Sequence, residues 1–404
     1  MTASHAFARS RLLAASVAAV AFALVSQPSF GDETYQPVFG PAIDWSILAR
    51  ISESVTLSTN RQLDGVNDDL EAQGTVSVGL TVAGVGKRTQ FSLATGFAAG
   101  RATDGDANNL DRFDPNLSAT AVFLRKGYSV NVSASGRTRP TSVSELEEDG
   151  DGDTTTDTTR IDASASVGVS WQPTKRDSMS VGTSVQIVDF SRTVGTLTPS
   201  RSVSVSASWS REVTRTTSLS LSSSVRQFDA EGANGSDSRS ANIQFGIRHE
   251  RTSRHSLGGS AGISLVSTEQ QNGGTSTQMG FVGSGSFSYT GAEITANLSL
   301  NQSIRPSSDG DLNAFTSLGG SLGYSINQLE NLSFGLSYSR RSDISGGGDV
   351  LQVLSLGPSY SYSLTQNSSL SLRYQFRVRD DETNGFETGH QLMLTLSHGL
   401  TLLD

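Results

Sequence analysis

The chain has 404 residues with 30 basic and 39 acidic side chains, 41 glycines and no cysteine, and only 35% of its residues are hydrophobic. That apolar share is too small for the two cores that a soluble protein of this length would need, and a net charge of −9 argues against a nucleic-acid partner. The absence of cysteine fits an oxidising compartment and a fold that needs no disulfides.

The N-terminus has the composition of an export signal. Arg9 and Arg11 precede a short apolar stretch, 12–25, which small residues follow. This order predicts a signal peptide over residues 1–31 that is cleaved before Asp32. A short periplasmic segment, 32–42, would then precede the folded part, and a retained N-terminal anchor is the alternative.

From residue 43 onward the chain repeats runs of about ten residues that alternate apolar and polar side chains. In the run 218–228, Leu219, Leu221 and Val225 fall on one face and serines on the other. A period of two is that of a β-strand. Eighteen strands are predicted: 43–60, 73–84, 88–101, 116–124, 128–138, 160–171, 178–190, 202–211, 218–228, 240–250, 256–267, 277–289, 292–304, 314–326, 332–341, 351–363, 368–379 and 390–402.

The connections between these runs alternate between short turns and longer polar segments, the longest being 139–159. This alternation is typical of a transmembrane antiparallel up-and-down β-barrel, in which short turns face the periplasm and long loops face outward. We therefore expect an all-β barrel of about 18 strands over 43–404, in the outer membrane of a Gram-negative bacterium, with both termini periplasmic. The count ranges from 16 to 19, because 43–60 could be two strands around Ser52 to Ser54.

Charges are sorted between the two ends of the predicted barrel. The three lysines, Lys87, Lys126 and Lys175, lie in or beside short turns, whereas acidic residues gather in long loops such as 145–157. Trp171 also lies at a strand end next to a short turn, as does Trp209, where an aromatic girdle is expected. Lipid and lipopolysaccharide are the partners that such a surface predicts, together with the barrel insertion machinery.

The alternation also predicts which side chains face the lumen. Small hydroxyl and amide side chains dominate that face, so an 18-stranded barrel should enclose open water unless a loop folds in. Arginines gather toward the outer strand ends, where they would either bias a pore toward anions or pair with acidic loops and lipid phosphates. Aromatic residues such as Phe91, Phe97 and Phe281 fall on the lipid-facing register, and no interior row of them can be assembled. The pore-lining candidates are Arg137, Ser204, Ser206, Ser220, Ser222, Arg226, Asn297, Asn301, Arg341, Arg373, Gln375, Arg377 and Arg379.

The chain contains motifs that resemble catalytic and calcium-binding sites, but they lack the structural context that such sites need. Gly-x-Ser-x-Gly strings occur at 258–262 and 319–323, but both lie inside predicted strands with no helix following, unlike a nucleophile elbow. The acidic run 147–153 lacks the glycine and glutamate positions of a calcium loop, so loose divalent binding is the alternative to a solvated acidic loop. The histidines show no ligand spacing. We expect no enzyme, no cofactor and no metal site.

One resemblance covers about 41–404. Ser52-Glu53-Ser54-Val55, followed by Asp68-Asp69, Gly84 and Lys87-Arg88, is similar to the opening of outer-membrane barrels from exopolysaccharide and exosortase gene clusters. That family opens with Asp-Asn-Val, from which Glu53-Ser54 departs. The resemblance implies a Ser-lined conduit for a secreted polysaccharide, fed by a periplasmic polysaccharide-export protein.

Two alternatives remain: a general diffusion porin for small solutes, and a structural barrel without transport. The last strand departs from most bacterial barrels because the chain ends at Leu403 and Asp404 instead of at an aromatic residue. Its register is therefore the weakest part of the predicted sheet.

Overall fold

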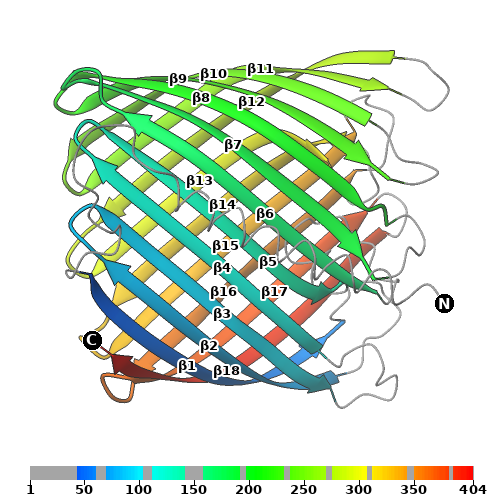
Figure 1. Ribbon diagram of the computed structural model, residues 1–404. Helices are drawn as coiled ribbons and strands as arrows, with labels where there is room; N and C mark the ends of the chain where they lie inside the picture. The colour runs from blue at the N-terminus through cyan, green and yellow to red at the C-terminus, as the bar shows by residue number, and fades with distance from the viewer. Residues whose placement is uncertain are drawn as a thin grey trace, which may run out of the picture.

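The computed structural model describes residues 43–60, 70–102, 112–141, 158–191, 197–231, 237–269, 275–306, 312–343, 350–381 and 385–403. These residues form a closed antiparallel barrel of 18 strands, each paired with its neighbours in sequence (Figure 1). The strands are β1 Asp44–Thr59, β2 Leu70–Val85, β3 Thr89–Ala102, β4 Arg112–Arg125, β5 Tyr128–Pro140, β6 Thr159–Trp171, β7 Asp177–Phe190, β8 Ser200–Thr214, β9 Thr217–Ala230, β10 Asp237–Thr252, β11 His255–Glu269, β12 Thr275–Thr290, β13 Ile294–Pro306, β14 Leu312–Ser325, β15 Glu330–Asp343, β16 Leu351–Ser363, β17 Ser368–Asp381 and β18 Gly385–Leu403.

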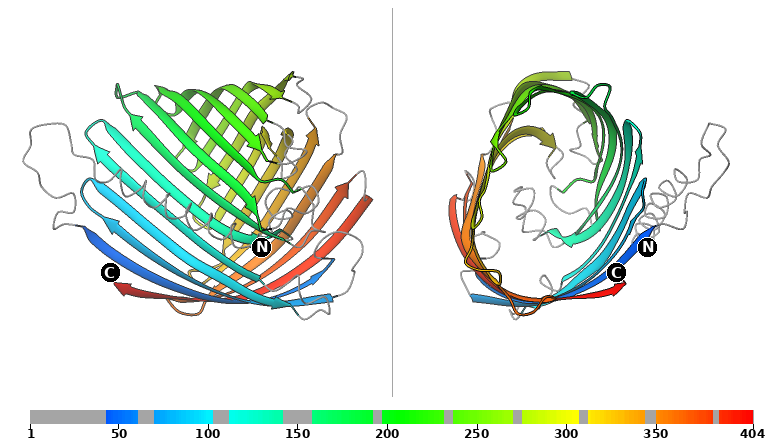
Figure 2. Two further views of the ribbon diagram at one scale, coloured as in Figure 1. Left: turned by 45° about the vertical axis from the view of Figure 1, so that its right-hand side comes forward. Right: turned by 90° about the vertical axis from the view of Figure 1, so that its left-hand side faces the viewer.

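The first and last strands close the barrel. β1 pairs with β18 from Ile47 opposite Leu403 to Thr59 opposite His390, with one irregularity between Ile47 and Leu48. β1 is one continuous strand through Ser52 to Ser54, so the even count of 18 is confirmed. The right-hand view of Figure 2 shows the strands as a ring seen along its axis.

The eight short turns lie at one end of the barrel, here called the short-turn end, and the C-terminus lies there too (Figure 1). A two-residue turn joins β4 to β5 through Lys126 and Gly127, and Gly127 has a φ of 89°, which a side chain would disfavour. The nine longer connections lie mostly outside the described residues, as do the acidic run 147–153 and the signal peptide. Several strands extend further than predicted toward the end of the barrel opposite the short turns. β2 begins at Leu70 instead of residue 73, and β18 begins at Gly385 instead of residue 390.

The outward face carries large apolar side chains that are exposed on every part of the wall. Phe281 is 59% exposed, Ile243 49% and Leu394 46%. A belt of this extent would aggregate in water and matches the lipid-facing surface of a membrane barrel. At the short-turn end, Trp45 packs edge-on against Phe91 at 6.2 Å between ring centres, as an interfacial girdle does.

No helix in the described ranges is long and apolar enough to cross a bilayer. Both Gly-x-Ser-x-Gly strings lie inside strands, 258–262 in β11 and 319–323 in β14. The sharp strand-to-helix turn of a nucleophile elbow is therefore missing at both serines.

Candidate functional site

The inward face follows from the strand register. Cross-strand partners share a face, so Ser204 opposite Arg226 on β9, and Arg226 opposite Ser240 on β10, point the same way. Continued around the barrel, the register puts all the predicted pore-lining candidates on this inward face: Arg137, Ser204, Ser206, Ser220, Ser222, Arg226, Asn297, Asn301, Arg341, Arg373, Gln375, Arg377 and Arg379.

Serine pairs cover much of this face. Ser180 and Ser208 share a hydrogen bond of 2.7 Å, and Ser184 and Ser204 another of the same length. Equivalent pairs join β5 to β6, β11 to β12 and β15 to β16. In each pair the two hydroxyls are hydrogen-bonded between neighbouring strands. The inward face here is therefore polar, and its side chains are short.

The two halves of the inward face differ in exposure. Near the short-turn end Ser206 and Ser208 are exposed, whereas toward the opposite end Ser264 is 0% and Phe228 2% exposed. The inward side chains of the opposite half are therefore much less exposed than those of the short-turn half, and the open, water-filled lumen stays a prediction.

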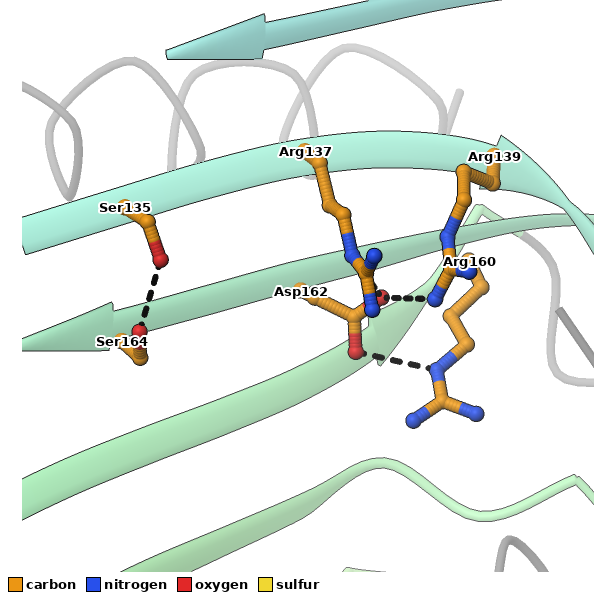
Figure 3. A network of polar contacts seen from close by, with 6 residues as sticks. All are labelled: Ser135, Arg137, Arg139, Arg160, Asp162 and Ser164. Atoms are coloured by element: carbon orange, nitrogen blue, oxygen red, sulfur yellow. Dashed lines mark hydrogen bonds and ion pairs between the residues drawn. The ribbon is translucent and has the colours of Figure 1, made fainter. Parts of the chain in front are cut away.

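A carboxylate surrounded by arginines marks that opposite half (Figure 3). Asp162 on β6 accepts hydrogen bonds from Arg139 at 3.1 Å and Arg160 at 3.0 Å, and the Nε of Arg137 lies 3.7 Å from its Oδ2. The side chains of Arg139 and Arg160 are each only 8% exposed. One carboxylate therefore holds three guanidinium groups together on the inward face of β5 and β6.

A second basic group lies on β17. Arg377 and Arg379 are 8% and 5% exposed, and Arg379 donates to Asp381 at 2.9 Å. Gln375, one inward position below them, donates to Ser355 on β16. Arg341 on β15 faces inward opposite Leu351 and Phe315, so the basic character continues along the wall.

A third group joins residues from distant strands. The guanidinium carbon of Arg305 on β13 lies 3.9 Å from the ring centre of Phe315 on β14, a cation–π contact. Arg305 also repels the half-buried Arg226 on β9. Among the described residues Arg226 has no hydrogen bond and no ion pair.

Several inward residues were not predicted from the sequence. Arg139 was assigned to the longest loop, 139–159, but it lies in β5. Arg160 was predicted as the first residue of a strand and lies in β6, but it was not chosen as a pore-lining candidate. The aromatic residues that the alternation was used to assign did not include Phe190, Phe228 and Phe315, which face inward and are 5%, 2% and 6% exposed. Each of the three continues the serine parity of its own strand, so the alternation carried the signal.

The described residues contain no group of three or more acidic, histidine or cysteine side chains placed to hold a metal ion. The histidines instead bond singly to neighbours, as His249 does to Thr217 at 3.0 Å and His398 to Ser368 at 2.7 Å.

Comparisons with known proteins agree with this architecture. Residues 229–394 match a family model described as "putative MetA-pathway of phenol degradation". The FrpB iron transporter from Neisseria meningitidis (F3-3 variant) is similar with a TM-score of 0.50 at 7% identity, over 88% of this chain and 81% of that one. OpdQ from Pseudomonas aeruginosa has a TM-score of 0.47 at 11% identity, over 89% and 98%. The outer membrane protein opdK of the same organism also has a TM-score of 0.47 at 11% identity, over 89% and 99%.

No curated protein matches the sequence. At these identities the structural likeness shows the fold, a large barrel of the outer-membrane kind. The family match covers less than half of the chain.

Proposed function

We propose that this protein is an outer-membrane channel that admits small organic anions, with single-ring aromatic anions as the preferred class. It is inserted in the outer membrane of a Gram-negative bacterium, with the short-turn end in the periplasm. The proposal corresponds to the small-solute alternative of the sequence analysis rather than to polysaccharide export.

One observation carries the anion preference: Arg226 faces inward, is partly desolvated, has no hydrogen-bond or ion-pair partner among the described residues, and is repelled by the like charge of Arg305. Two guanidinium groups that face a lumen and repel each other are stabilised by an anion between or near them. Their surroundings are partly desolvated, which strengthens that attraction relative to bulk water.

The aromatic preference follows from the neighbours of these arginines. Phe228 lies two residues from Arg226 on the same inward face, and Phe315 stacks under Arg305. The two rings are buried, so they give the surroundings of the arginines an apolar character that suits an anion carrying an aromatic ring. The description of the matched family, which names phenol degradation, supports the same class.

Polysaccharide export has less support. A polymer needs a clear path along the whole axis, and the inward side chains of the opposite half are buried around Ser264, Phe228 and Arg379. The serine wall of the short-turn half suits hydroxyl-rich solutes, but the large inward side chains of the opposite half favour small solutes over a polymer.

Bilayer recording tests the proposal. The purified barrel in a salt gradient should show an anion-selective reversal potential, and Arg226→Gln should reduce the anion-to-cation permeability ratio at least threefold. Arg239→Gln is the matched control, because Arg239 on the adjacent strand β10 shares the outward register of Gln227 and Ser267. In liposome swelling, benzoate should enter faster than the similarly sized cation benzylammonium. A cation-selective channel, or equal effects of the two substitutions, would refute the anion preference.

A further inference from the structure

The barrel wall has one seam at which neighbouring strands separate. β12 pairs with β11 along its whole length, from Thr275 to Tyr289. With β13, however, it pairs only from Gly283 opposite Gln302 to Thr290 opposite Thr295. The residues of β12 from Thr275 to Val282 therefore have no described partner on the β13 side, whereas the rest of β13 remains paired with β14 through Pro306.

Beyond the point of separation, β13 lies on the inward side of β12. In the β13 register, Ile304 shares the outward parity of Leu298 and Leu300, which are 47% and 50% exposed, yet Ile304 is only 8% exposed. Its Cδ1 occupies the space where a Cβ on the inward-facing Gly280 would lie. It packs there with Val266 and Val282, which are 3% and 2% exposed and face inward.

The position of Arg305 agrees with this inward displacement. Arg305 interacts electrostatically with Arg226 on β9, although three strands stand between β9 and β13 in the wall. Along an undistorted wall those strands would be separated by roughly 19 Å, at about 4.8 Å per strand. In the end-on view of Figure 2, a strand end in the yellow part of the colour range lies inside the ring.

The seam lies at membrane depth. Phe281 is eight residues from Tyr289 at the short-turn end of β12. With about 3.3 Å per residue and a tilt of about 45°, that distance is roughly 19 Å along the barrel axis, within an apolar band about 25 Å tall. Unpaired backbone at this depth is tolerated where it lines water or protein and is costly against lipid.

Both sides of the seam are apolar. On the outward side Met279 and Phe281 are 70% and 59% exposed, and on the inward side lie Val266, Val282 and Ile304. The charged Arg305 follows Ile304 directly in β13 and has the opposite, inward parity. The chemistry of the seam therefore suits uncharged molecules and excludes ions.

We propose that the seam between β12 and β13 is a lateral path by which small uncharged aromatic molecules pass between the lumen and the hydrocarbon core of the membrane. The side chain of Ile304 covers the inward side of this path. The proposal rests on the proposed channel function, because the molecule must first enter the lumen, and it adds a second exit that differs from the axial path of anions.

A disulfide across the seam tests this path. Cγ1 of Ile304 lies 3.5 Å from the position of a Cβ on residue 280, so Gly280→Cys with Ile304→Cys brings the two sulfurs within bonding reach. Ser284→Cys with Asn301→Cys is the matched control, because these residues already pair directly on the same two strands. Disulfide formation is checked by mass spectrometry.

The readout combines two solutes in cells that carry the full-length protein in their outer membrane. Entry of the uncharged dye N-phenylnaphthylamine is followed by its fluorescence in membrane, and the anion current of the purified variants is recorded in parallel. The oxidised seam should lower dye entry at least fivefold and leave the anion current within twofold, with recovery on reduction. The control pair should change neither value.

Three results would overturn the lateral path. The first is unchanged dye entry with the seam disulfide formed, and the second is a parallel fall of dye entry and anion current, which would place both solutes on the axial path. Ile304→Ala, which needs no disulfide, should raise dye entry at least twofold. The third contradicting result is an unchanged rate of dye entry in this variant. An unsubstituted barrel without anion selectivity would instead contradict the proposed function. The comparison of dye entry between the oxidised and reduced seam variants would still test the lateral path.

Discussion

The short-turn half and the opposite half of this barrel are built from the same strands but differ in the size, charge and exposure of their inward side chains. In the short-turn half, paired serines such as Ser180 and Ser208 give a thin polar wall that remains exposed. In the opposite half, Asp162 holds three arginines, and phenylalanines point inward where Phe228 is 2% exposed. The comparison teaches that the exposure of the inward face is set by the side chains that the strands carry, because the strand number is the same in both halves.

The largest effect should come from the charged cluster of the opposite half. Asp162→Asn removes the carboxylate that faces Arg137, Arg139 and Arg160, which leaves like charges close together in a buried setting. We expect a loss of about 3 kcal/mol in the free energy of unfolding. Urea unfolding in lipid vesicles, followed by tryptophan fluorescence, measures it.

Asp189→Asn is the matched control for this cluster. Asp189 lies on the neighbouring strand β7 opposite Ile161, with its side chain outward and exposed. Its substitution should cost less than about 0.5 kcal/mol. Equal losses at positions 162 and 189 would mean that the cluster is not what distinguishes the two halves.

A smaller effect is expected where β13 crosses β12. Gly280→Ala places a methyl group against Ile304 Cδ1 and should destabilise the barrel by about 2 kcal/mol. The combination with Ile304→Ala should restore most of that stability, which a double-mutant cycle detects. Gly285→Ala on the same strand meets only Leu300 Cβ, at 3.9 Å, and should be tolerated. Without any coupling between residues 280 and 304, the inward position of β13 would be in doubt.

The smallest effect should come from the serine wall. Ser180→Ala with Ser208→Ala removes both partners of one hydrogen bond at an exposed site. Since no buried polar atom is left unpaired, we expect a change below about 0.5 kcal/mol and an unchanged anion selectivity. A larger change in either measurement would show that the short-turn half also contributes to selectivity.

Much of this architecture could be predicted from the alternation alone. The run 218–228 specified β9, its two faces and the inward position of Arg226. The same parity, carried two residues further, would have found Phe228 as an inward aromatic residue. The charge cluster could not be predicted from the alternation alone. The register of β5 against β6, with Arg139 opposite Arg160, determines which arginines reach Asp162.

The seam could not be predicted from the sequence. By its own alternation Ile304 is an outward residue, like Leu298 and Leu300, and its burial arises only because β13 leaves β12 after Gln302. Pairing between strands is a tertiary property that a single strand's pattern does not record. Glycine at position 280 is compatible with the crossing but does not by itself signal it.

The pairing of β1 with β18 has a consequence for how the barrel forms. Ser52 and Ser397 share a hydrogen bond of 3.0 Å across a sequence separation of 345 residues. Contacts this distant form late and slowly, because loop closure must precede any gain from them. Until the last strand arrives, the growing sheet has two open edges, each able to pair with the wrong chain. The time between synthesis of β1 and arrival of β18 is therefore the period in which this protein depends most on being held apart from its neighbours.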